Sequence, residues 1–415
     1  MSIGIVGLGY VGLPLAVAFA EAGHDVVGLD VDQRKVAAIR AGDSYIEDIP
    51  SERLRGVDGR IAATTRYADL AGTEAIVIAV PTPLTTNREP DLGPLLDSSR
   101  AVAGVLQSGQ LVVLESTTYP GTTREQLVPL LEESGLGAGR DFHVAFSPER
   151  VDPGRTDYTL RTTPKVVGGL TEACTERAVE LYSRVVDDVV RVSSPEVAEL
   201  TKLLENIFRS VNIALVNELA MLTDRMGIDI WEVVDAASTK PYGFMRFEPG
   251  PGMGGHCLPV DPFYLSWRAR EFDMTTRFVE LAGEINQQMP YHCVSRVERT
   301  LNAHGKAVNG AKVGLLGVSY KAGVGDVRES PALKIIALLK ALGADLHYHD
   351  EFVPEVREAE MRNEPLDAVV DGADIVVIVT AHPGIDFAAI AEKVPALLDL
   401  RGVTRDVAAT NVVRL

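Results

Sequence analysis

The chain opens with a glycine pattern that few folds can accommodate. An apolar run at residues 3–6 leads directly into Gly7-Leu-Gly-Tyr-Val-Gly12, and residues 13–22 then have the spacing of an apolar helix. The order strand, glycine turn, helix is the context in which this otherwise weak pattern becomes informative. It predicts the first unit of a parallel α/β sheet that binds a dinucleotide.

Each glycine of such a turn has its own reason to lack a side chain. Gly7 makes the tight turn, Gly9 lets the backbone approach a pyrophosphate, and Gly12 lets the helix pack closely on the strand. The N-terminus of the helix then faces the phosphates. The residues expected to contact the cofactor in this turn are Gly7, Gly9, Tyr10, Val11 and Gly12.

The second predicted strand, residues 25–29, ends at Asp30. A carboxylate at this position accepts hydrogen bonds from the adenosine ribose hydroxyls and repels a 2′-phosphate, so it favours NAD over NADP. Arg34 and Lys35 follow closely and weaken that preference slightly, and Lys35 joins the cofactor-binding candidates.

Three further apolar runs, at residues 74–80, 111–115 and 143–146, alternate with helical patterns and predict a doubly wound parallel sheet. Such sheets bind ligands beyond the carboxyl ends of their strands. The polar loops that leave those ends are residues 81–83, 116–123 and 147–150, and Glu149 in the last of them is a carboxylate at the mouth of the sheet.

Residues 196–226 contain neither glycine nor proline and predict one long helix that is apolar on more than one face. Lys202, Asn206 and Arg209 share one polar stripe of that helix. Because such broad apolar faces must be covered, we expect the helix to connect domains or to pair with a second copy of the chain. A helical pair is predicted around residues 274–301.

The loop Gly250–Asp261 is rich in glycine and carries one cysteine, Cys257. A lone cysteine is usually a small buried hydrophobe. Beside a bound NAD, however, a thiol is useful when an aldehyde must be carried on to an acid, because the thiolate adds to the aldehyde and a thioester is later hydrolysed. Lys202 and Asn206 would then stabilise an oxyanion, and Asp261 or Glu149 would handle protons.

The architecture begins again after a linker at residues 303–310. A strand, a glycine and a polar loop lead to a helix at residues 331–342, and residues 373–380 echo residues 73–80. The fold class is therefore α/β, with two Rossmann-like doubly wound parallel-sheet domains joined by a central helical domain. The expected domains are residues 1–192, 193–302 and 303–415.

The second α/β domain lacks the complete glycine fingerprint, so it is expected to hold a different ligand. Lys321 and Arg328 in its first loop suit a ligand that carries phosphate. His347 and His349 alternate on a strand, but no third ligand accompanies them, so we predict no metal site.

The composition excludes several classes of protein. A net charge of −18 argues against nucleic acid as a partner, and no apolar run approaches the roughly 20 residues needed to span a bilayer. The three cysteines are scattered and odd in number, which fits a reducing compartment. We expect a cytoplasmic protein that contacts no membrane.

In combination, these motifs resemble the UDP-glucose/GDP-mannose dehydrogenase family from end to end. The resemblance rests on Gly7-Leu-Gly-Tyr-Val-Gly12, Glu115-Ser-Thr, Lys202-xxx-Asn206, Gly254-Gly-His-Cys-Leu-Pro-Val-Asp-Pro-Phe-Tyr264 and Tyr320-Lys through Gly325-Asp-Val-Arg-Glu-Ser330. It implies a four-electron oxidation of the C6 alcohol of a nucleotide sugar to a carboxylate, with two NAD consumed per turnover.

The resemblance also implies roles for individual residues. Cys257 is the nucleophile, Lys202 and Asn206 stabilise the oxyanion, and Asp261 assists through water. Glu149 and Thr117 match positions tied to thioester hydrolysis and to the placement of cofactor and water. Lys321 contacts the bound nucleotide, and Arg328 reaches the NAD pyrophosphate. The remaining candidates are Pro81, Thr82 and Ser116 for the cofactor, and Arg150, Arg209, Gly254 and His256 for the substrate.

Within the family, the sequence is most similar to UDP-N-acetylglucosamine 6-dehydrogenases. Arg150 after Glu149 predicts a polar sugar pocket that suits an acetamido group, and His256 precedes the cysteine. UDP-N-acetylmannosamine and UDP-glucose are the alternative substrates. The long helix predicts a homodimer, and a role in polysaccharide biosynthesis follows from the resemblance.

Two readings from other classes stay open. The chain could be a non-catalytic NAD-binding sensor that retains the dimer helix. It could also be a hydroxyacid or phosphogluconate-type dehydrogenase with Lys and Asn on the central helix, although that chemistry needs no loop thiol.

Overall fold

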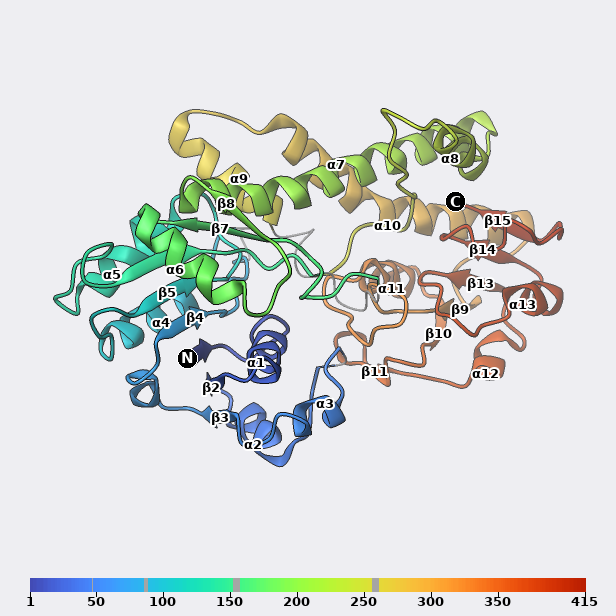
Figure 1. Cartoon of the computed structure of the whole chain (residues 1–415). Coiled ribbons are helices and arrows are strands. Elements are labelled where there is room, and N and C mark those ends of the chain that lie inside the picture. Colours follow the sequence, from blue (N-terminus) through green and yellow to red (C-terminus); the bar gives the residue numbers. More distant parts are fainter. Residues whose placement is uncertain (47, 86–88, 152–156, 256–260) are drawn as a thin grey trace. The chain divides into compact units, whose positions relative to one another are not determined.

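The computed structural model describes residues 1–46, 48–85, 89–151, 157–255 and 261–415 of the chain. It divides the chain into two compact units, Met1–Glu205 with Phe263–Thr275, and Asn206–Pro262 with Thr276–Leu415. Each unit is built on one large, mostly parallel sheet, coloured blue to green in the first and orange to red in the second (Figure 1). The predicted domain boundaries at residues 192 and 302 stay a prediction.

The first unit is built on an eight-stranded sheet in the order β3-β2-β1-β4-β5-β6-β7-β8. All neighbouring strands run parallel except β6 and β7. The order reverses between β1 and β4, which is where such sheets open a crevice for a ligand. The strands are β1 (Ser2–Val6), β2 (Asp25–Leu29), β3 (Ile61–Thr64), β4 (Ala75–Ile78), β5 (Leu111–Leu114), β6 (His143–Phe146), β7 (Lys165–Gly169) and β8 (Val189–Val192).

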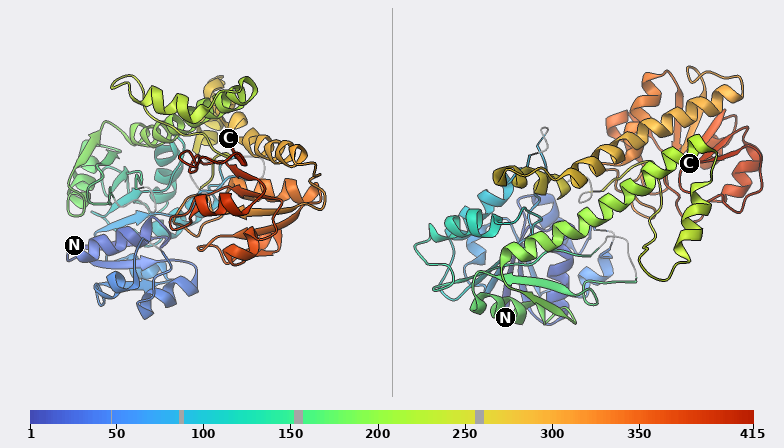
Figure 2. Two further views of the ribbon diagram at one scale, coloured as in Figure 1. Left: turned by 90° about the vertical axis from the view of Figure 1, so that its right-hand side faces the viewer. Right: turned by 90° about the horizontal axis from the view of Figure 1, so that it is seen from above.

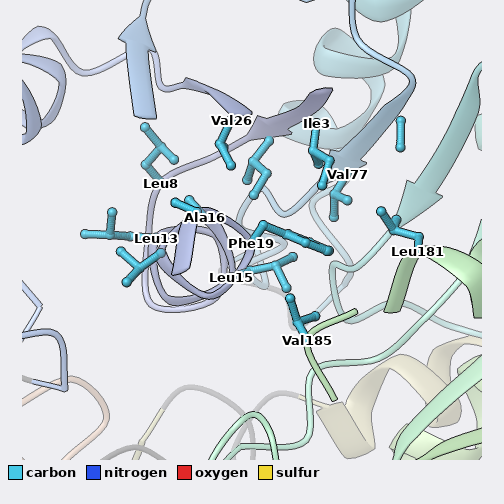
Figure 3. Close-up of a cluster of buried hydrophobic side chains, with 14 of the residues drawn as sticks. Ile3, Leu8, Leu13, Leu15, Ala16, Phe19, Val26, Val77, Leu181 and Val185 are labelled. Atoms are coloured by element: carbon cyan, nitrogen blue, oxygen red, sulfur yellow. The ribbon is translucent and has the colours of Figure 1, made fainter. Parts of the chain in front are cut away.

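Helices cover this sheet and bury its apolar runs. The first helix contributes Leu13, Leu15 and Phe19 to a buried cluster that also contains Ile3, Val26 and Val77 of the sheet (Figure 3). These side chains are almost fully buried, so the packing fixes the glycine turn that joins strand to helix. The helices are α1 (Gly12–Glu21), α2 (Gln33–Ala41), α3 (Ser51–Arg55), α4 (Gly93–Ala103), α5 (Val128–Glu132) and α6 (Glu172–Tyr182).

The predicted long helix is present as α7 (Pro195–Met226), which runs unbroken for 32 residues (Figure 2). Three more helices follow it, α8 (Ile230–Ser238), α9 (Asp261–Ala269) and α10 (Arg277–Ala303). The predicted helical pair around residues 274–301 is wrong, because α10 is one helix with Pro290 inside it. Pro290 is buried, and tertiary packing holds the helix together across a residue that usually breaks it.

The second unit contains a five-stranded, fully parallel sheet in the order β10-β9-β13-β14-β15. Its strands are β9 (Lys312–Leu316), β10 (Asp345–His349), β13 (Ile375–Ile378), β14 (Leu397–Asp399) and β15 (Val412–Arg414), and β11 (Glu355–Val356) pairs with β12 (Met361–Arg362) beside it. Besides α8 and α10, this unit contains α11 (Pro331–Ala341), α12 (Leu366–Val370) and α13 (Phe387–Lys393).

The two-sheet α/β fold with a long central helix is therefore confirmed. The echo between residues 73–80 and 373–380 corresponds to β4 and β13, which each pair with the first strand of their own sheet. Among the described residues, no helix combines the length and apolar character needed to cross a membrane.

Candidate active site

The turn between β1 and α1 is a tight backbone crossing. A Cβ at Gly7, where φ is +94°, would lie 2.5 Å from the carbonyl oxygen of Ala79, and a Cβ at Gly12 would lie 1.8 Å from the carbonyl oxygen of Gly7. Neither position accepts a side chain without movement of the backbone. A Cβ at Gly9, by contrast, would meet nothing within 4 Å. The open space at Gly9 therefore fits a pyrophosphate at the N-terminus of α1.

Asp30 lies at the end of β2, beside this turn. Its Oδ2 accepts hydrogen bonds from the Leu8 N–H and from Lys35 Nζ, each at 2.9 Å, and its Oδ1 accepts one from the Asp32 N–H at 2.9 Å. A carboxylate accepts about four hydrogen bonds, so one position remains for a ribose hydroxyl. The predicted partners Asp30 and Lys35 are thus brought together, and the residues of this turn fit NAD.

Hydrogen bonds join the loops that follow β4 and β5. The Thr82 hydroxyl donates to the Thr117 carbonyl oxygen at 2.6 Å, and the Ser116 hydroxyl donates to the Val80 carbonyl oxygen at 2.6 Å. The buried Tyr264 of α9 donates its hydroxyl to the Thr82 carbonyl oxygen. Pro81 is exposed at the start of the first loop. These candidate residues therefore form one connected edge of the sheet.

Glu149 lies in the loop after β6, with its carboxylate mostly buried. Oε1 accepts hydrogen bonds from the N–H groups of Arg150 and Val151, each at 2.6 Å, and Oε2 lies 3.4 Å from Lys165 Nζ. Burial opposes the charged form, but the Lys165 charge, the two N–H groups and the Lys202 charge outweigh it and lower the pKa of Glu149. The carboxylate is therefore held as an anion.

Lys165 links Glu149 to a second carboxylate that sequence reasoning left without a role. Lys165 is the first residue of β7, and its Nζ also contacts the carboxylate of Glu115, to which Tyr182 donates its hydroxyl at 2.6 Å. Burial alone would lower the pKa of Lys165, but Glu115 and Glu149 together raise it. Burial raises the pKa of Glu115. The signal in the sequence is a lysine that begins a short apolar run.

A second buried carboxylate, Glu199 of α7, also escaped the sequence-based predictions. It accepts hydrogen bonds from the N–H groups of Gly121 and Thr123, at 2.6 and 2.8 Å, and from the Thr123 hydroxyl at 2.7 Å. Burial raises the pKa of Glu199 to about 7. This contact holds the end of the 116–123 loop against α7.

Lys202 lies one turn beyond Glu199 and acts electrostatically on Glu149. Arg150, next to Glu149, forms an ion pair with Glu205 of α7 at 2.6 Å and donates to the Pro164 carbonyl oxygen at 2.6 Å. The first unit therefore brings the predicted Glu149, Arg150 and Lys202 together around the start of α7.

The second unit contains the other predicted polar residues. The Asn206 amide donates to Oδ2 of Asp261 at 2.5 Å, and both side chains are buried. Cys257 and His256 lie outside the described residues. Arg209 is exposed on α7, one turn beyond Asn206. Asn206 and Asp261 thus form a buried pair, and Asp261 follows Cys257 by four residues in the sequence.

Two glycines of the cysteine loop pack against the loop after β9. A Cβ at Gly254 would lie 2.7 Å from Tyr320 Cβ, and one at Gly255, where φ is +89°, would lie 3.0 Å from the Tyr320 ring. The Gly255 N–H donates to the Arg328 carbonyl oxygen at 3.3 Å. Packing against Tyr320 therefore explains why these two positions are glycines. The close approach of the loop to a substrate, which the sequence predicted, would be a second reason.

The polar residues of the β9 loop have partners of their own. The Arg328 side chain pairs with Asp326 at 2.8 Å, and the Lys321 carbonyl oxygen accepts the Ser319 hydroxyl at 2.9 Å. Both Lys321 and Arg328 belong to the second unit, with Asn206 and Asp261.

Asp350 occupies the place in the second sheet that Asp30 occupies in the first, at the end of the strand beside the first strand. It is fully buried, and its Oδ2 accepts hydrogen bonds from the N–H groups of Val318 and Ser319, at 2.7 and 3.0 Å. His382 Nδ1 accepts the Gly323 N–H at 3.1 Å, so the proton lies on Nε2, which is 3.0 Å from Asp350 Oδ2. This carboxylate serves the fold.

The two strand histidines have ordinary partners. His347 Nδ1 lies 2.8 Å from the Glu364 carboxylate, and His349 Nδ1 lies 2.7 Å from the Glu364 carbonyl oxygen. Over the parts of the chain that the structure describes, no group of three or more His, Cys, Asp or Glu side chains could hold a metal ion.

Three domain models of one family match the chain in order. The NAD binding domain of the UDP-glucose/GDP-mannose dehydrogenase family matches residues 1–186, its central domain residues 196–288, and its UDP binding domain residues 314–406. The three segments cover most of the sequence.

Individual relatives are similar over nearly their whole length. UDP-N-acetyl-D-mannosamine dehydrogenase of Pyrococcus horikoshii is 38% identical over 387 residues, which cover 92% of this chain and 90% of the relative. UDP-N-acetyl-D-glucosamine 6-dehydrogenase of Pseudomonas aeruginosa is 35% identical over 389 residues, with the same coverage of 92% and 90%. A solved structure of the UDP-D-ManNAc dehydrogenase from Pyrococcus horikoshii superposes with a TM-score of 0.91 at 35% identity, covering 100% of this chain and 98% of that one.

Proposed function

The chain belongs to the UDP-glucose/GDP-mannose dehydrogenase family, and from that premise we propose that it oxidises C6 of a UDP-N-acetylhexosamine from the alcohol to the acid. Membership makes it an NAD-dependent UDP-sugar dehydrogenase of polysaccharide biosynthesis. UDP-N-acetylglucosamine is the first candidate, because a polar Arg150 follows Glu149. UDP-N-acetylmannosamine is the second, and the Pyrococcus horikoshii relative favours it.

The observation that carries the proposal is the buried Asn206–Asp261 pair. One hydrogen of the amide binds Asp261, and the other is a donor for a substrate oxygen. Asp261 follows Cys257 by four residues and begins α9, so the carboxylate of the pair is close to the thiol in the sequence. An amide donor, a carboxylate and a thiol are the groups that a thioester route from aldehyde to acid requires.

In this mechanism Cys257 is the nucleophile. Its thiolate adds to C6 of the aldehyde to give a thiohemiacetal, whose oxidation gives a thioester that water then cleaves. Bound NAD supplies the hydride acceptor for each of the two oxidations. Lys202 and the Asn206 amide stabilise the oxyanion that develops on the C6 oxygen, and Asp261 orders a water.

Glu149 is the proposed base for thioester hydrolysis. Support comes from its position after β6 and from the ionic contacts that keep it charged. Thr117 is the proposed contact for cofactor and water, and the 2.6 Å bond from the Thr82 hydroxyl fixes its backbone.

The cofactor is proposed to lie along the edge of the first sheet. The open Gly9, the remaining acceptor position of Asp30 and the linked loops after β4 and β5 support this placement. The residues that would hold NAD are Gly7, Gly9, Tyr10, Val11, Gly12, Asp30, Lys35, Pro81, Thr82, Ser116, Thr117 and Arg328.

The sugar nucleotide is proposed to contact charged, polar and small residues from both halves of the sequence. The candidates are Glu149, Arg150, Lys202, Asn206, Arg209, Gly254, His256 and Lys321. Arg150 already forms an ion pair with Glu205, so its guanidinium is held in place for a polar substituent.

We propose that the protein is a homodimer through α7. Exposed apolar side chains recur along this helix at intervals of three, four or seven residues, so they share one stripe. They are Val197, Leu200, Leu204, Phe208, Leu215, Leu219, Leu222 and Met226. A cytoplasmic location is part of the same proposal, supported by the free thiols Cys174 and Cys293.

A substrate panel tests the proposed reaction. UDP-glucose, UDP-N-acetylglucosamine, UDP-N-acetylmannosamine and GDP-mannose are each supplied with excess NAD, and NADH is measured per sugar consumed. We expect two NADH per UDP-N-acetylhexosamine. One NADH per sugar would mean a plain alcohol dehydrogenase, and none with any of the four would favour the NAD-binding sensor.

Replacing the thiol tests the covalent route. Cys257→Ser should lower uronate formation by about a hundredfold or more, because the hydroxyl is a much weaker nucleophile. Cys293→Ser is the matched control, because that thiol is fully buried and burial raises its pKa to about 12. Normal uronate yield from Cys257→Ser would rule out the thioester.

A further inference from the structure

Lys165 is a buried ammonium group between two carboxylates. Its side chain is only 3% exposed, and Nζ contacts the Glu115 carboxylate, which is fully buried. On its other side, Nζ lies 3.4 Å from Oε2 of Glu149. Nζ also lies 5.1 Å from the centre of the Tyr182 ring. Glu115, Lys165 and Glu149 thus form a continuous ionic chain from the interior of the first unit to the candidate base.

Stability alone is a weak reason to bury these three charged side chains together. A buried ion pair costs about as much in lost hydration as it gains in attraction, and apolar residues of similar size are often no less stable. Here one ammonium faces two carboxylates, so the buried group keeps a net negative charge. The Tyr182 hydroxyl stabilises only the Glu115 end.

We propose that Lys165 is a positioning residue for thioester hydrolysis, which holds the Glu149 carboxylate oriented and ready to accept a proton. The inference rests on the proposed function, because it presumes that Glu149 activates the water. Two N–H groups hold Oε1 and Lys165 faces Oε2, so both oxygens of Glu149 have a fixed direction.

The step that Lys165 serves is the last one of the cycle. The oxygen of water bonds to C6 of the thioester, the bond between C6 and the Cys257 sulfur breaks, and the sulfur leaves as a thiolate. Glu149 takes the proton that the water loses. No oxidant is needed, because both oxidations precede this step.

The charges around Glu149 determine whether losing Lys165 raises or lowers the pH at which Glu149 is protonated. Lys165 of β7 and Lys202 of α7 favour its anion, whereas Glu115 after β5 opposes it. Arg150 is neutralised by Glu205, and Tyr182 of α6 reaches this group through Glu115. Without Lys165, burial would prevail and Glu149 would take up a proton at a higher pH.

Removing Lys165 by itself would leave Glu115 buried without its cation, so the test uses a matched pair of variants. Glu115→Gln removes one carboxylate but keeps the ammonium and an acceptor for Tyr182. The double variant Lys165→Met/Glu115→Gln removes the ammonium as well, and neither change leaves an unpaired charge at Glu115. Lys312→Met is the control, since Lys312 is likewise the first residue of a strand, but its Nζ donates to the backbone oxygens of Ala368 and Asp371 rather than to carboxylates.

The probe is UDP-N-acetylglucosamine with NAD, and kcat is measured from pH 5 to 9. The mass of the acid-quenched protein is measured by mass spectrometry. In the double variant we expect a rapid burst of NADH and a protein that carries the sugar as a covalent adduct. Its kcat at pH 6 should be at least about tenfold lower than that of the unmodified protein and should recover toward pH 9. In Glu115→Gln the acid limb of kcat should not move to higher pH, and Lys312→Met should match the unmodified protein.

Three outcomes would overturn the inference. They are an unchanged acid limb in the double variant, an equal loss at every pH without an adduct, and an upward shift of the limb in Glu115→Gln that matches the double variant. If the unmodified protein forms no NADH with UDP-N-acetylglucosamine or with UDP-N-acetylmannosamine, the proposed function fails first. The two failures are therefore distinguishable.

Discussion

Gly9 and Gly12 lie in the same turn but exclude a side chain for different reasons. At Gly12 the excluded atom would meet the backbone of the protein itself, whereas at Gly9 it would enter open space. The sequence predicted both roles, because a glycine turn is specified by a few neighbouring residues. The structure therefore gives a packing reason for the glycine at position 12, whereas the proposed pyrophosphate is the reason for the glycine at position 9.

Alanine substitutions should separate these roles. Gly12→Ala should cost about 3 kcal/mol of stability, because its Cβ would displace the Gly7 carbonyl. Gly9→Ala should keep the thermal unfolding midpoint but weaken NAD binding at least about tenfold, because its methyl group points toward the expected pyrophosphate. Calorimetry of unfolding and titration with NAD measure the two effects. A Gly9→Ala protein that binds NAD normally would contradict this placement.

Lys165 and Glu199 could not be assigned from sequence in the same way. Their partners lie 50 and 76 residues away, at Glu115 and Thr123. A lysine or glutamate is usually exposed, and only the folded chain brings these two into contact with charges and donors. Cys257 was different, because glycines and a carboxylate mark its own loop.

Element by element, periodicity predicted the strands and helices that carry a strong pattern. The apolar strands β1, β4 and β5 and the unbroken helix α7 were expected from sequence and are present. The short strand β7 was missed, because it begins with a lysine and ends with two glycines, which β-strands disfavour. In α10 the local signal of Pro290 was overridden by burial.

Glu199 of α7 should make the stability of the protein depend on pH. Its pKa is raised from 4.5 to about 7 in the folded chain. Its contribution is therefore fully present below about pH 4.5 and is lost as the pH rises through about 7. The loss amounts to about 3 kcal/mol, or roughly 5–10 °C in the unfolding midpoint.

Glu199→Gln should remove this fall of stability with rising pH between pH 5 and 8, because an amide does not titrate. The slope of stability against pH should therefore become flatter. Glu196→Gln, one turn earlier on α7, should leave the slope in place, since Glu196 pairs at the surface with Arg124. Thermal unfolding at several pH values measures the effect. A slope that survives in Glu199→Gln would assign the pH dependence to another group.

On the scale of the whole molecule, the two α/β sheets could be predicted from sequence. The assignment of the central helices to one compact unit or the other could not. Similar apolar runs in the two halves of the sequence predicted the two sheets, and each sheet has its own hydrophobic core. The compact units, however, share α7 and α9 between them, since each unit is made of two separate segments. Contacts between distant segments decide such a grouping, and a linear pattern does not contain them.

The apolar stripe of α7 predicts the behaviour of the assembled protein. Leu215→Glu together with Leu219→Glu should turn the proposed dimer into a monomer, because charges would be buried in its interface. Leu342→Glu, at an exposed leucine of the C-terminal domain, should leave the dimer intact. Sedimentation velocity distinguishes the two states. An unmodified protein that is monomeric at micromolar concentration would contradict the dimer.

Asp350 bears on how genomes are searched for cofactor-binding proteins. Searches for dinucleotide sites give weight to an acid at the end of the second strand, and this chain has such an acid in both of its halves. In the second half the acid is fully buried and is held by three backbone N–H groups, those of Val318, Ser319 and Phe352, and by His382. In this chain His382 takes the acceptor position that remains open at Asp30, so the acid alone does not distinguish the half that fits a dinucleotide from the half that does not.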